Sequence, residues 1–195
     1  MAYIGVDYGS KLAGTTAACS WNHDRFLLTQ TVKNQDADAW ILELVKIHQP
    51  KILFLDAPLS LPGIYSKLPC YNDFFYRKAD QELKAMSPMF LGGLTARAMQ
   101  LAQNLPVPVI EVYPAARAKQ LELYALSYKK NNEGLTACVA AVAKQLPAPF
   151  AQALMALEIN NWHAFDAVLA WEIGYRYLQG IANMAGTEEE GLLFW

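Results

Sequence analysis

Cysteine is scarce in this chain, whose 195 residues include only Cys19, Cys70 and Cys138. The number is odd, and the three positions lack the short spacing of metal ligands. Both observations give little support to a disulfide framework or a zinc site. We therefore expect three reduced and buried thiols.

Long hydrophobic runs are also missing. No apolar stretch approaches the roughly 18 residues that suggest a membrane span, and no basic segment or cleavage signal precedes the strand-like sequence that begins at Tyr3. These absences predict a cytoplasmic protein without a membrane partner.

A surplus of positive charge is lacking too, because the formal net charge is -2. Nonspecific affinity for long nucleic acids grows with the number of phosphates that Lys and Arg neutralise, so any contact with nucleic acid must be local. Solvated helix faces explain most of the basic residues equally well. The candidates for such a contact are Arg77, Lys78, Lys84, Arg97, Arg117, Lys119, Lys129 and Lys130.

The composition that remains is that of a globular protein, with 54% hydrophobic and 17% charged residues. Length gives no reason to expect two domains, so we predict one domain over residues 1–195. Proline, glycine and many aromatic residues interrupt any periodic pattern around residues 57–76. This segment is expected to be a long loop or lid-like insertion.

The apolar pattern predicts an α/β fold. Strand-like residues at 3–7, 14–19 and 25–32 indicate an antiparallel meander. A helical stripe over 36–48 precedes an apolar run at 52–55, which favours a parallel strand covered on both faces, and a second parallel strand is expected at 106–111. Further helices are expected at 77–85, 95–105, 114–124, 135–145, 149–159 and 162–178. An apolar terminal strand at 191–195 needs cover, from the sheet or from the second subunit of a homodimer.

Carboxylates follow the strands that should be parallel neighbours. Asp7, Asp56 and Glu111 each come at the end of an apolar run, and such strand ends meet at the edge where open α/β proteins place ligands. Asp166 lies on the late helix, with His163 three residues before it on the same helical face. Crowded carboxylates repel one another unless cations or protons intervene.

An acidic cluster of this kind predicts a bound divalent metal. Carboxylate oxygens suit Mg²⁺ or Mn²⁺ better than zinc, which prefers His and Cys. Two such ions, roughly 4 Å apart, could stabilise the attacking water and the leaving oxygen in phosphodiester hydrolysis.

Five motifs in this order resemble those of a predicted-nuclease family, domain of unknown function 429, within the ribonuclease H-like superfamily. They are Ile4–Asp7, Asp56–Pro62, Arg77–Asp80, Glu111–Pro114 and Phe165–Ala167. The resemblance implies an RNase H-like three-layer fold with a mixed five-stranded sheet flanked by helices. It also implies that Asp7, Asp56 and Asp166 are metal ligands of a nuclease.

Two neighbouring pairs are candidates for supporting roles. The spacing of His163 and Asp166 is similar to the end of RuvC-like nuclease domains, which implies proton transfer by His163; a neutral His bonded to a backbone carbonyl is the alternative. Arg77 could bind a phosphate bidentately while Asp80 orients it. An ordinary intrahelical ion pair would explain that second pair equally well.

Two other functions stay open at this stage. A non-catalytic RNase H-like module could bind nucleic acid or a protein. In addition, residues 7–11 resemble the first phosphate loop of actin-like sugar kinases and chaperone ATPases, which makes Lys11 a candidate substrate contact. Those proteins need two such subdomains to enclose a nucleotide, and this chain has room for one. The sequence does not distinguish RNA from DNA or endonuclease from exonuclease action.

Overall fold

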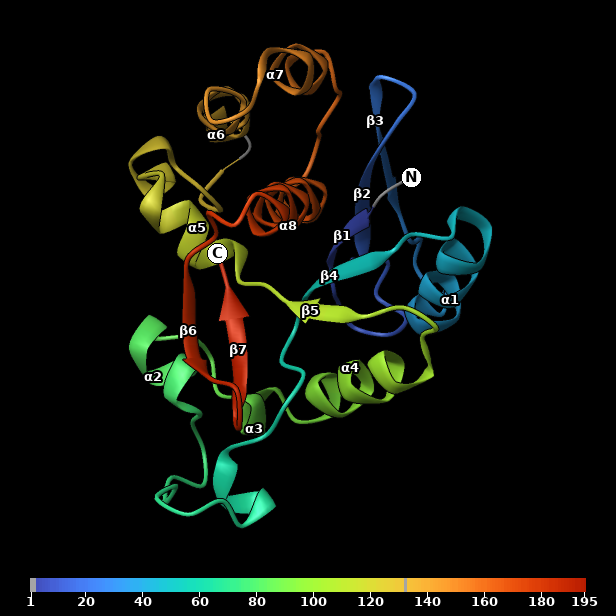
Figure 1. Ribbon diagram of the computed structural model, residues 1–195. Helices are drawn as coiled ribbons and strands as arrows, with labels where there is room; N and C mark the ends of the chain where they lie inside the picture. Colours follow the sequence, from blue (N-terminus) through green and yellow to red (C-terminus); the bar gives the residue numbers. More distant parts are fainter. Residues whose placement is uncertain (1–2, 132) are drawn as a thin grey trace.

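A five-stranded mixed sheet with the strand order β3-β2-β1-β4-β5 forms the centre of the computed structural model (Figure 1). The structure describes residues 3–131 and 133–195, so residues 1, 2 and 132 of the predicted single domain lie outside the description. The first three strands form an antiparallel meander, and the last two continue parallel to the first. The strands are β1 (Tyr3–Asp7), β2 (Ala17–Asn22), β3 (Arg25–Gln30), β4 (Ile52–Asp56) and β5 (Val109–Glu111). The predicted α/β class and sheet are confirmed.

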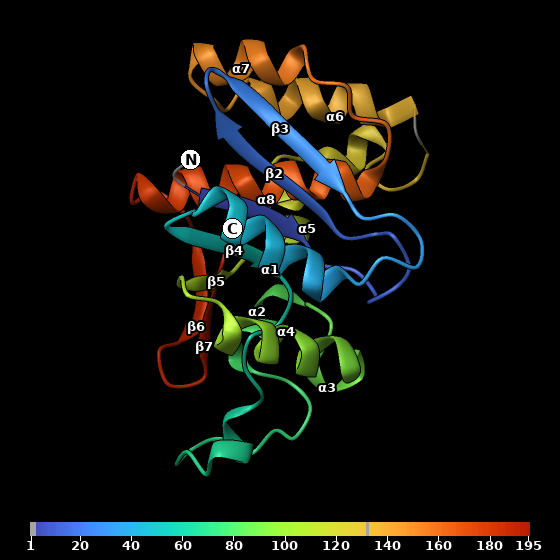
Figure 2. The ribbon, with the colours of Figure 1, turned by 90° about the vertical axis from the view of Figure 1, so that its right-hand side faces the viewer.

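Helices cover both faces of the sheet and make three layers (Figures 1 and 2). On one side, Ile4 and Val6 of β1 pack with Ile41 of α1 and Leu101 of α4. On the other side, the large cluster around Trp171 joins the sheet to the late helices. The covering helices are α1 (Ala37–His48) and α4 (Gly93–Asn104) on the first face, and α6 (Glu133–Ala143), α7 (Ala148–Met155) and α8 (Trp162–Leu178) on the second.

Two glycines leave no room for a side chain where α8 packs against the sheet. A Cβ atom added at Gly5 of β1 would lie 2.2 Å from the backbone nitrogen of Trp171. One added at Gly174 would lie 2.5 Å from the ring of Phe54 on β4. Because neither distance is compatible with a real side chain, glycine at these positions sets the helix-to-sheet spacing and hence the height of Asp166 above β1.

A C-terminal hairpin extends the molecule beyond β5. Its strands are β6 (Met184–Thr187) and β7 (Gly191–Phe194). The backbone N–H of Tyr113 donates to the carbonyl of Phe194 at 2.9 Å, and the ring of Phe194 lies edge-on to that of Tyr177. The apolar terminus is therefore covered by its own chain, and the homodimer through this terminus stays a prediction.

The segment after β4 is largely irregular and projects from the rest of the molecule in both views (Figures 1 and 2). The backbone N–H groups of Gly63 and Lys78 both donate to the Glu190 side chain at 2.7 Å, so the hairpin fastens both ends of the segment. Its short helices are η1 (Gly63–Ser66), α2 (Lys78–Leu83) and α3 (Pro88–Leu91).

Some local predictions need correction. The helix predicted at 114–124 is divided into α5 (Pro114–Gln120) and η2 (Leu123–Leu126), because Glu122 adopts a left-handed conformation with φ of 55°. Cys70 is exposed in the irregular segment, whereas Cys19 and Cys138 are buried as expected. No helix in the described part of the chain has the length and apolar character needed to cross a membrane.

Candidate metal centre

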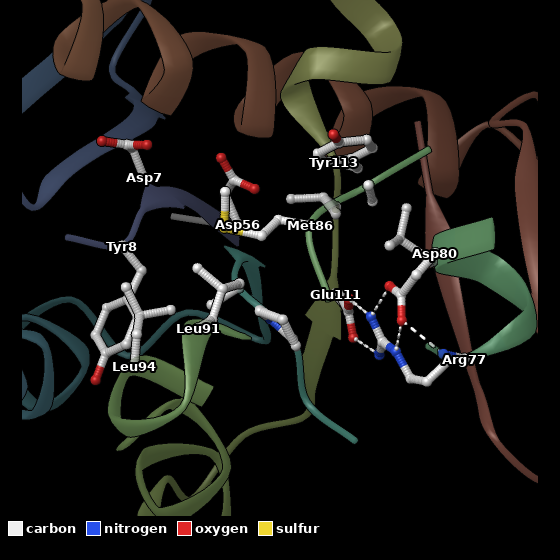
Figure 3. A pocket seen from close by; sticks show the side chains of 15 residues that line it. Asp7, Tyr8, Asp56, Arg77, Asp80, Met86, Leu91, Leu94, Glu111 and Tyr113 are labelled. Carbon is white, nitrogen blue, oxygen red and sulfur yellow. Dashed lines mark hydrogen bonds and ion pairs between the residues drawn. The ribbon is translucent and has the colours of Figure 1, made fainter. Parts of the chain in front are cut away.

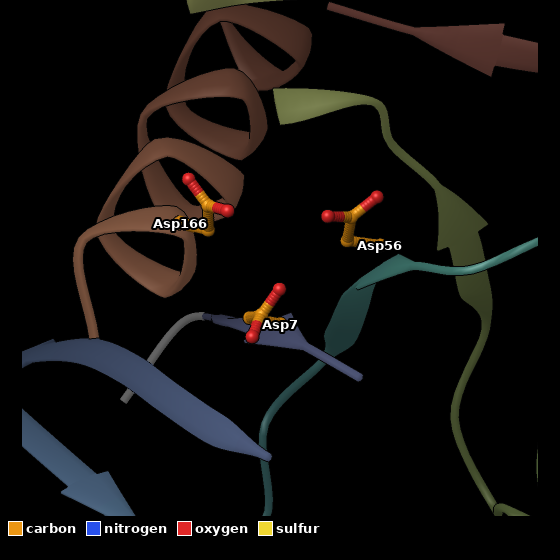
Figure 4. Close-up of side chains that lie close together, drawn as sticks. All are labelled: Asp7, Asp56 and Asp166. Atoms are coloured by element: carbon orange, nitrogen blue, oxygen red, sulfur yellow. The ribbon is translucent and has the colours of Figure 1, made fainter. Parts of the chain in front are cut away.

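Three carboxylates converge where β1, β4 and α8 meet (Figure 4). Asp7, Asp56 and Asp166 each offer one oxygen, and these oxygens lie within 4.8 Å of one another. Asp7 and Asp166 are buried, and Asp56 is half-buried. Residues far apart in the sequence thus form one acidic cluster of hard oxygen donors.

The sheet register explains why the first two acids meet. Asp7 and Asp56 are directly paired across the parallel strands β1 and β4, so their side chains leave the sheet on the same face. The third acid lies on α8, which is capped by Asn161: the Asn161 side chain accepts a hydrogen bond from the Ala164 N–H at 2.9 Å. Asp166 follows one turn later on the face that packs against β1.

The cluster concentrates negative charge where water cannot screen it. Burial and then the neighbouring charges of Asp7 and Asp166 raise the pKa of Asp56 well above its usual value. Burial also raises the pKa of Asp166 to about 6, although Lys129 opposes this rise. A site of this kind is stabilised by cations or protons that compensate the repulsion.

Three side chains surround the acids. His163 Nδ1 lies 2.9 Å from Oδ2 of Asp7, and this hydrogen bond raises the pKa of His163. Tyr128 donates its hydroxyl to Oδ1 of Asp166 at 2.7 Å, and the Nζ of Lys129 forms an ion pair with Oδ2 of the same carboxylate. His163 therefore contacts a carboxylate rather than a backbone carbonyl.

Tyr128 and Lys129 are site residues that the sequence did not reveal. They follow the short helix η2, in a stretch with no periodic pattern, and Lys129 has a left-handed backbone with φ of 56°. Lys129 stood out in the sequence only as one of several basic residues. The turn that carries it to Asp166 depends on tertiary packing, so no local signal could have identified it.

Glu111 does not join the cluster. Its partner across the parallel strands is Leu55, one residue before Asp56. Because side chains alternate between the two faces of a strand, this one-residue offset places Glu111 and Asp56 on opposite faces. The expectation that all three strand-end acids gather at one point is therefore corrected for Glu111.

Glu111 instead belongs to a buried ion-pair network with Arg77 and Asp80 (Figure 3). All five N–H donors of the Arg77 guanidinium are used: three contact the carboxylates at 2.7 Å, the Nε donates to Asp80 at 3.0 Å, and another reaches Ser60 at 2.9 Å. The side chain is 1% exposed. The Arg77 guanidinium thus has all its donors used within the protein, and a role for Arg77 and Asp80 in binding a phosphate stays a prediction.

Lys11, the other predicted substrate contact, lies on the turn after β1. Its Nζ is 3.2 Å from Oδ2 of Asp36, and half of its side chain is exposed. This is a surface ion pair at the start of α1, where Asp36 caps the helix. A role for Lys11 in substrate binding stays a prediction.

A cavity of about 200 Å³ opens beside the acids (Figure 3). Asp7 and the Arg77 network lie at opposite ends of the cavity, with Asp56 between them (Figure 3). Most of the other lining side chains are apolar, among them Met86, Leu91, Leu94, Pro58 and the ring of Tyr113. The cavity therefore offers space for an organic group next to a charged centre.

Comparisons with protein-family models, with curated proteins and with solved structures found no match. The sheet order and the change from antiparallel to parallel pairing are compatible with a ribonuclease H-like fold. Membership of the family that the motifs imply stays a prediction. The functional conclusion must therefore come from the site itself.

Proposed function

We propose that this protein is a metal-dependent phosphodiester hydrolase, a nuclease that uses Mg²⁺ or Mn²⁺. The observation that carries the proposal is the convergence of Asp7, Asp56 and Asp166 within 4.8 Å. Three carboxylates at a sheet edge match the hard donors that these ions prefer. Because the three carboxylates are largely buried and repel one another, a bound cation would stabilise the site.

A divalent ion at these carboxylates would activate a water molecule and polarise a phosphoryl oxygen. Asp7 and Asp56 project from neighbouring strands, so the rigid sheet fixes their separation. His163 contacts Asp7 while about half of its side chain remains exposed. It can therefore exchange a proton with solvent and deliver it near the reacting phosphate.

The cavity supports a phosphodiester with an organic substituent of limited size. Its apolar wall lies next to Asp7 and Asp56, so the substituent can pack there while the phosphate faces the acids. Arg77 is the sole basic residue of the lining, and its donors are all used within the protein. Such a site suits a local contact with one or two nucleotides, consistent with the net charge of -2.

The test is a cleavage screen with structured and unstructured DNA and RNA in Mg²⁺, Mn²⁺ or EDTA. The wild type should cleave at least one substrate in a metal-dependent manner. The cleavage activity of Asp7→Asn should be lower by about a hundredfold or more. Substitution of a residue that only hydrogen-bonds to a metal ligand already lowers activity by up to about a hundredfold. Equal activity in the variant would expose a contaminating nuclease, and binding without cleavage would support the non-catalytic module.

A further inference from the structure

Both oxygens of Asp166 are already engaged within the protein. Oδ1 accepts a hydrogen bond from the hydroxyl of Tyr128 at 2.7 Å, and Oδ2 pairs with the ammonium group of Lys129. Oδ2 is buried and has no hydrogen bond among the residues that the structure describes. Its one compensating contact is thus the positive charge of Lys129.

The oxygens that remain available belong to the other two acids. His163 uses Oδ2 of Asp7, which leaves Oδ1 of Asp7 open. Within residues 3–131 and 133–195, no hydrogen bond or ion pair reaches the carboxylate of Asp56. The carboxylate oxygens without a partner therefore belong to Asp7 and Asp56, whereas an ammonium group already lies beside Asp166.

The position of Lys129 is built into the fold. The preceding residue, Tyr128, is 2% exposed, and its ring packs at 5.3 Å against Trp162 and at 6.1 Å against Phe165. The Lys129 ammonium also lies 5.3 Å from the centre of the Tyr128 ring. This anchor directs the lysine to Asp166, although about half of its side chain is exposed.

The balance of charge among the acids and Lys129 favours a single metal ion in the cluster. Three carboxylates carry three negative charges, which one divalent ion and one ammonium group neutralise. A second divalent ion would leave an excess of two positive charges in a partly buried site, and it would compete with Lys129 for Asp166.

From these contacts we infer that the site binds one divalent ion, held by Asp7 and Asp56, and that the Lys129 ammonium group occupies the position of a second ion on Asp166. This inference rests on the proposed function but replaces the two ions expected from the sequence. Lys129 supplies the second positive charge toward the phosphate of the substrate.

The test is the stoichiometry of Mn²⁺ binding to the full chain, measured by isothermal titration calorimetry and by electron paramagnetic resonance of free Mn²⁺. The wild type should bind one ion at the cluster. Lys129→Met should bind two, because Asp166 is then free to act as a ligand. Lys130→Met is the matched control, since this neighbouring lysine is exposed, and it should bind one ion like the wild type.

Lys129→Arg keeps the charge and should also bind one ion, so it separates loss of charge from loss of fold. Two ions in the wild type, or a single ion in a folded Lys129→Met variant, would overturn the inference. If the wild type bound no Mn²⁺ at all, the result would instead contradict the proposed metal-dependent function. The two failures are therefore distinguishable without an activity measurement.

Discussion

At the scale of single residues, the acidic cluster works against the stability of the metal-free protein. Asp56 lies between two other carboxylates, and its pKa is raised by burial first and by these neighbours second. An ionised carboxylate whose pKa is raised in the folded protein lowers the free energy of unfolding, unless a bound cation compensates its charge. Residues that prepare a site for a ligand are commonly suboptimal for stability in this way.

Replacing Asp56 should therefore stabilise the metal-free protein. We expect Asp56→Asn to raise the free energy of unfolding in EDTA by about 1 kcal/mol, because the amide removes the repulsion without changing the shape of the side chain. Thermal unfolding with and without Mn²⁺ measures this effect. Mn²⁺ should raise the melting temperature of the wild type but not of the variant. A variant that is less stable than the wild type in EDTA would refute the proposed repulsion.

Arg77 should behave in the opposite way. Its removal leaves Asp80 and Glu111 buried without their cation, and the loss of one partner from a buried ion pair costs about 3–5 kcal/mol. Urea unfolding of Arg77→Met should show a loss of this size. Arg25→Met, at an exposed position on β3, is the matched control and should change stability by less than about 0.5 kcal/mol. A much smaller loss of stability in Arg77→Met would show that the ion-pair network is not essential to the fold, and would support a role for Arg77 in substrate binding.

At the scale of secondary structure elements, the site depends on the close approach of α8 to β1. Gly5→Ala would place a Cβ atom 2.2 Å from the Trp171 backbone nitrogen, so the helix must move outward. We expect a loss of about 3 kcal/mol in stability and weaker Mn²⁺ binding, because Asp166 and its partner Lys129 shift with the helix.

Gly93→Ala provides the control for this prediction. An added Cβ atom at Gly93, the first residue of α4, meets no atom within 4 Å. Alanine there should be neutral or stabilise the protein by up to about 1 kcal/mol, as expected for a helix. Circular dichroism with Mn²⁺ titration of both variants would compare them directly. Normal metal binding in Gly5→Ala would show that the site does not require this spacing.

The elements also show how far sequence reasoning reaches. The strands and the long helix were predictable because apolar periodicity is local, and Asp7 and Asp56 followed from where β1 and β4 end. Glu111 was misplaced because the register between strands depends on tertiary packing, and an offset of one residue reverses the face. Lys129 was only one of several basic candidates in the sequence, because its contact with Asp166 depends on a turn between helices that carries no pattern of its own.

At the scale of the whole molecule, the charge distribution limits how a nucleic acid can bind. The net charge is -2, and the cavity beside the acids contains no cation with a free donor among its lining residues. Lys129 and a bound metal ion would provide the positive charge of the site. The molecule therefore suits a short contact at the scissile phosphate rather than a long electrostatic track.

This limit predicts a weak dependence of binding on salt. For the inactive Asp7→Asn variant, the logarithm of the association constant should fall with the logarithm of salt concentration with a slope of about -1 to -2, which corresponds to one or two neutralised phosphates. Fluorescence anisotropy with a labelled oligonucleotide at several salt concentrations measures this slope. A slope several times steeper would reveal a basic binding surface that the account does not contain.

The most direct test of the central claim is the anomalous X-ray scattering of a crystal of this protein soaked in Mn²⁺. We expect an anomalous peak between the carboxylates of Asp7 and Asp56, at about 2.2 Å from their oxygens, with the Lys129 ammonium group still beside Asp166. A crystal that binds Mn²⁺ elsewhere but shows no peak between Asp7 and Asp56 would contradict this claim.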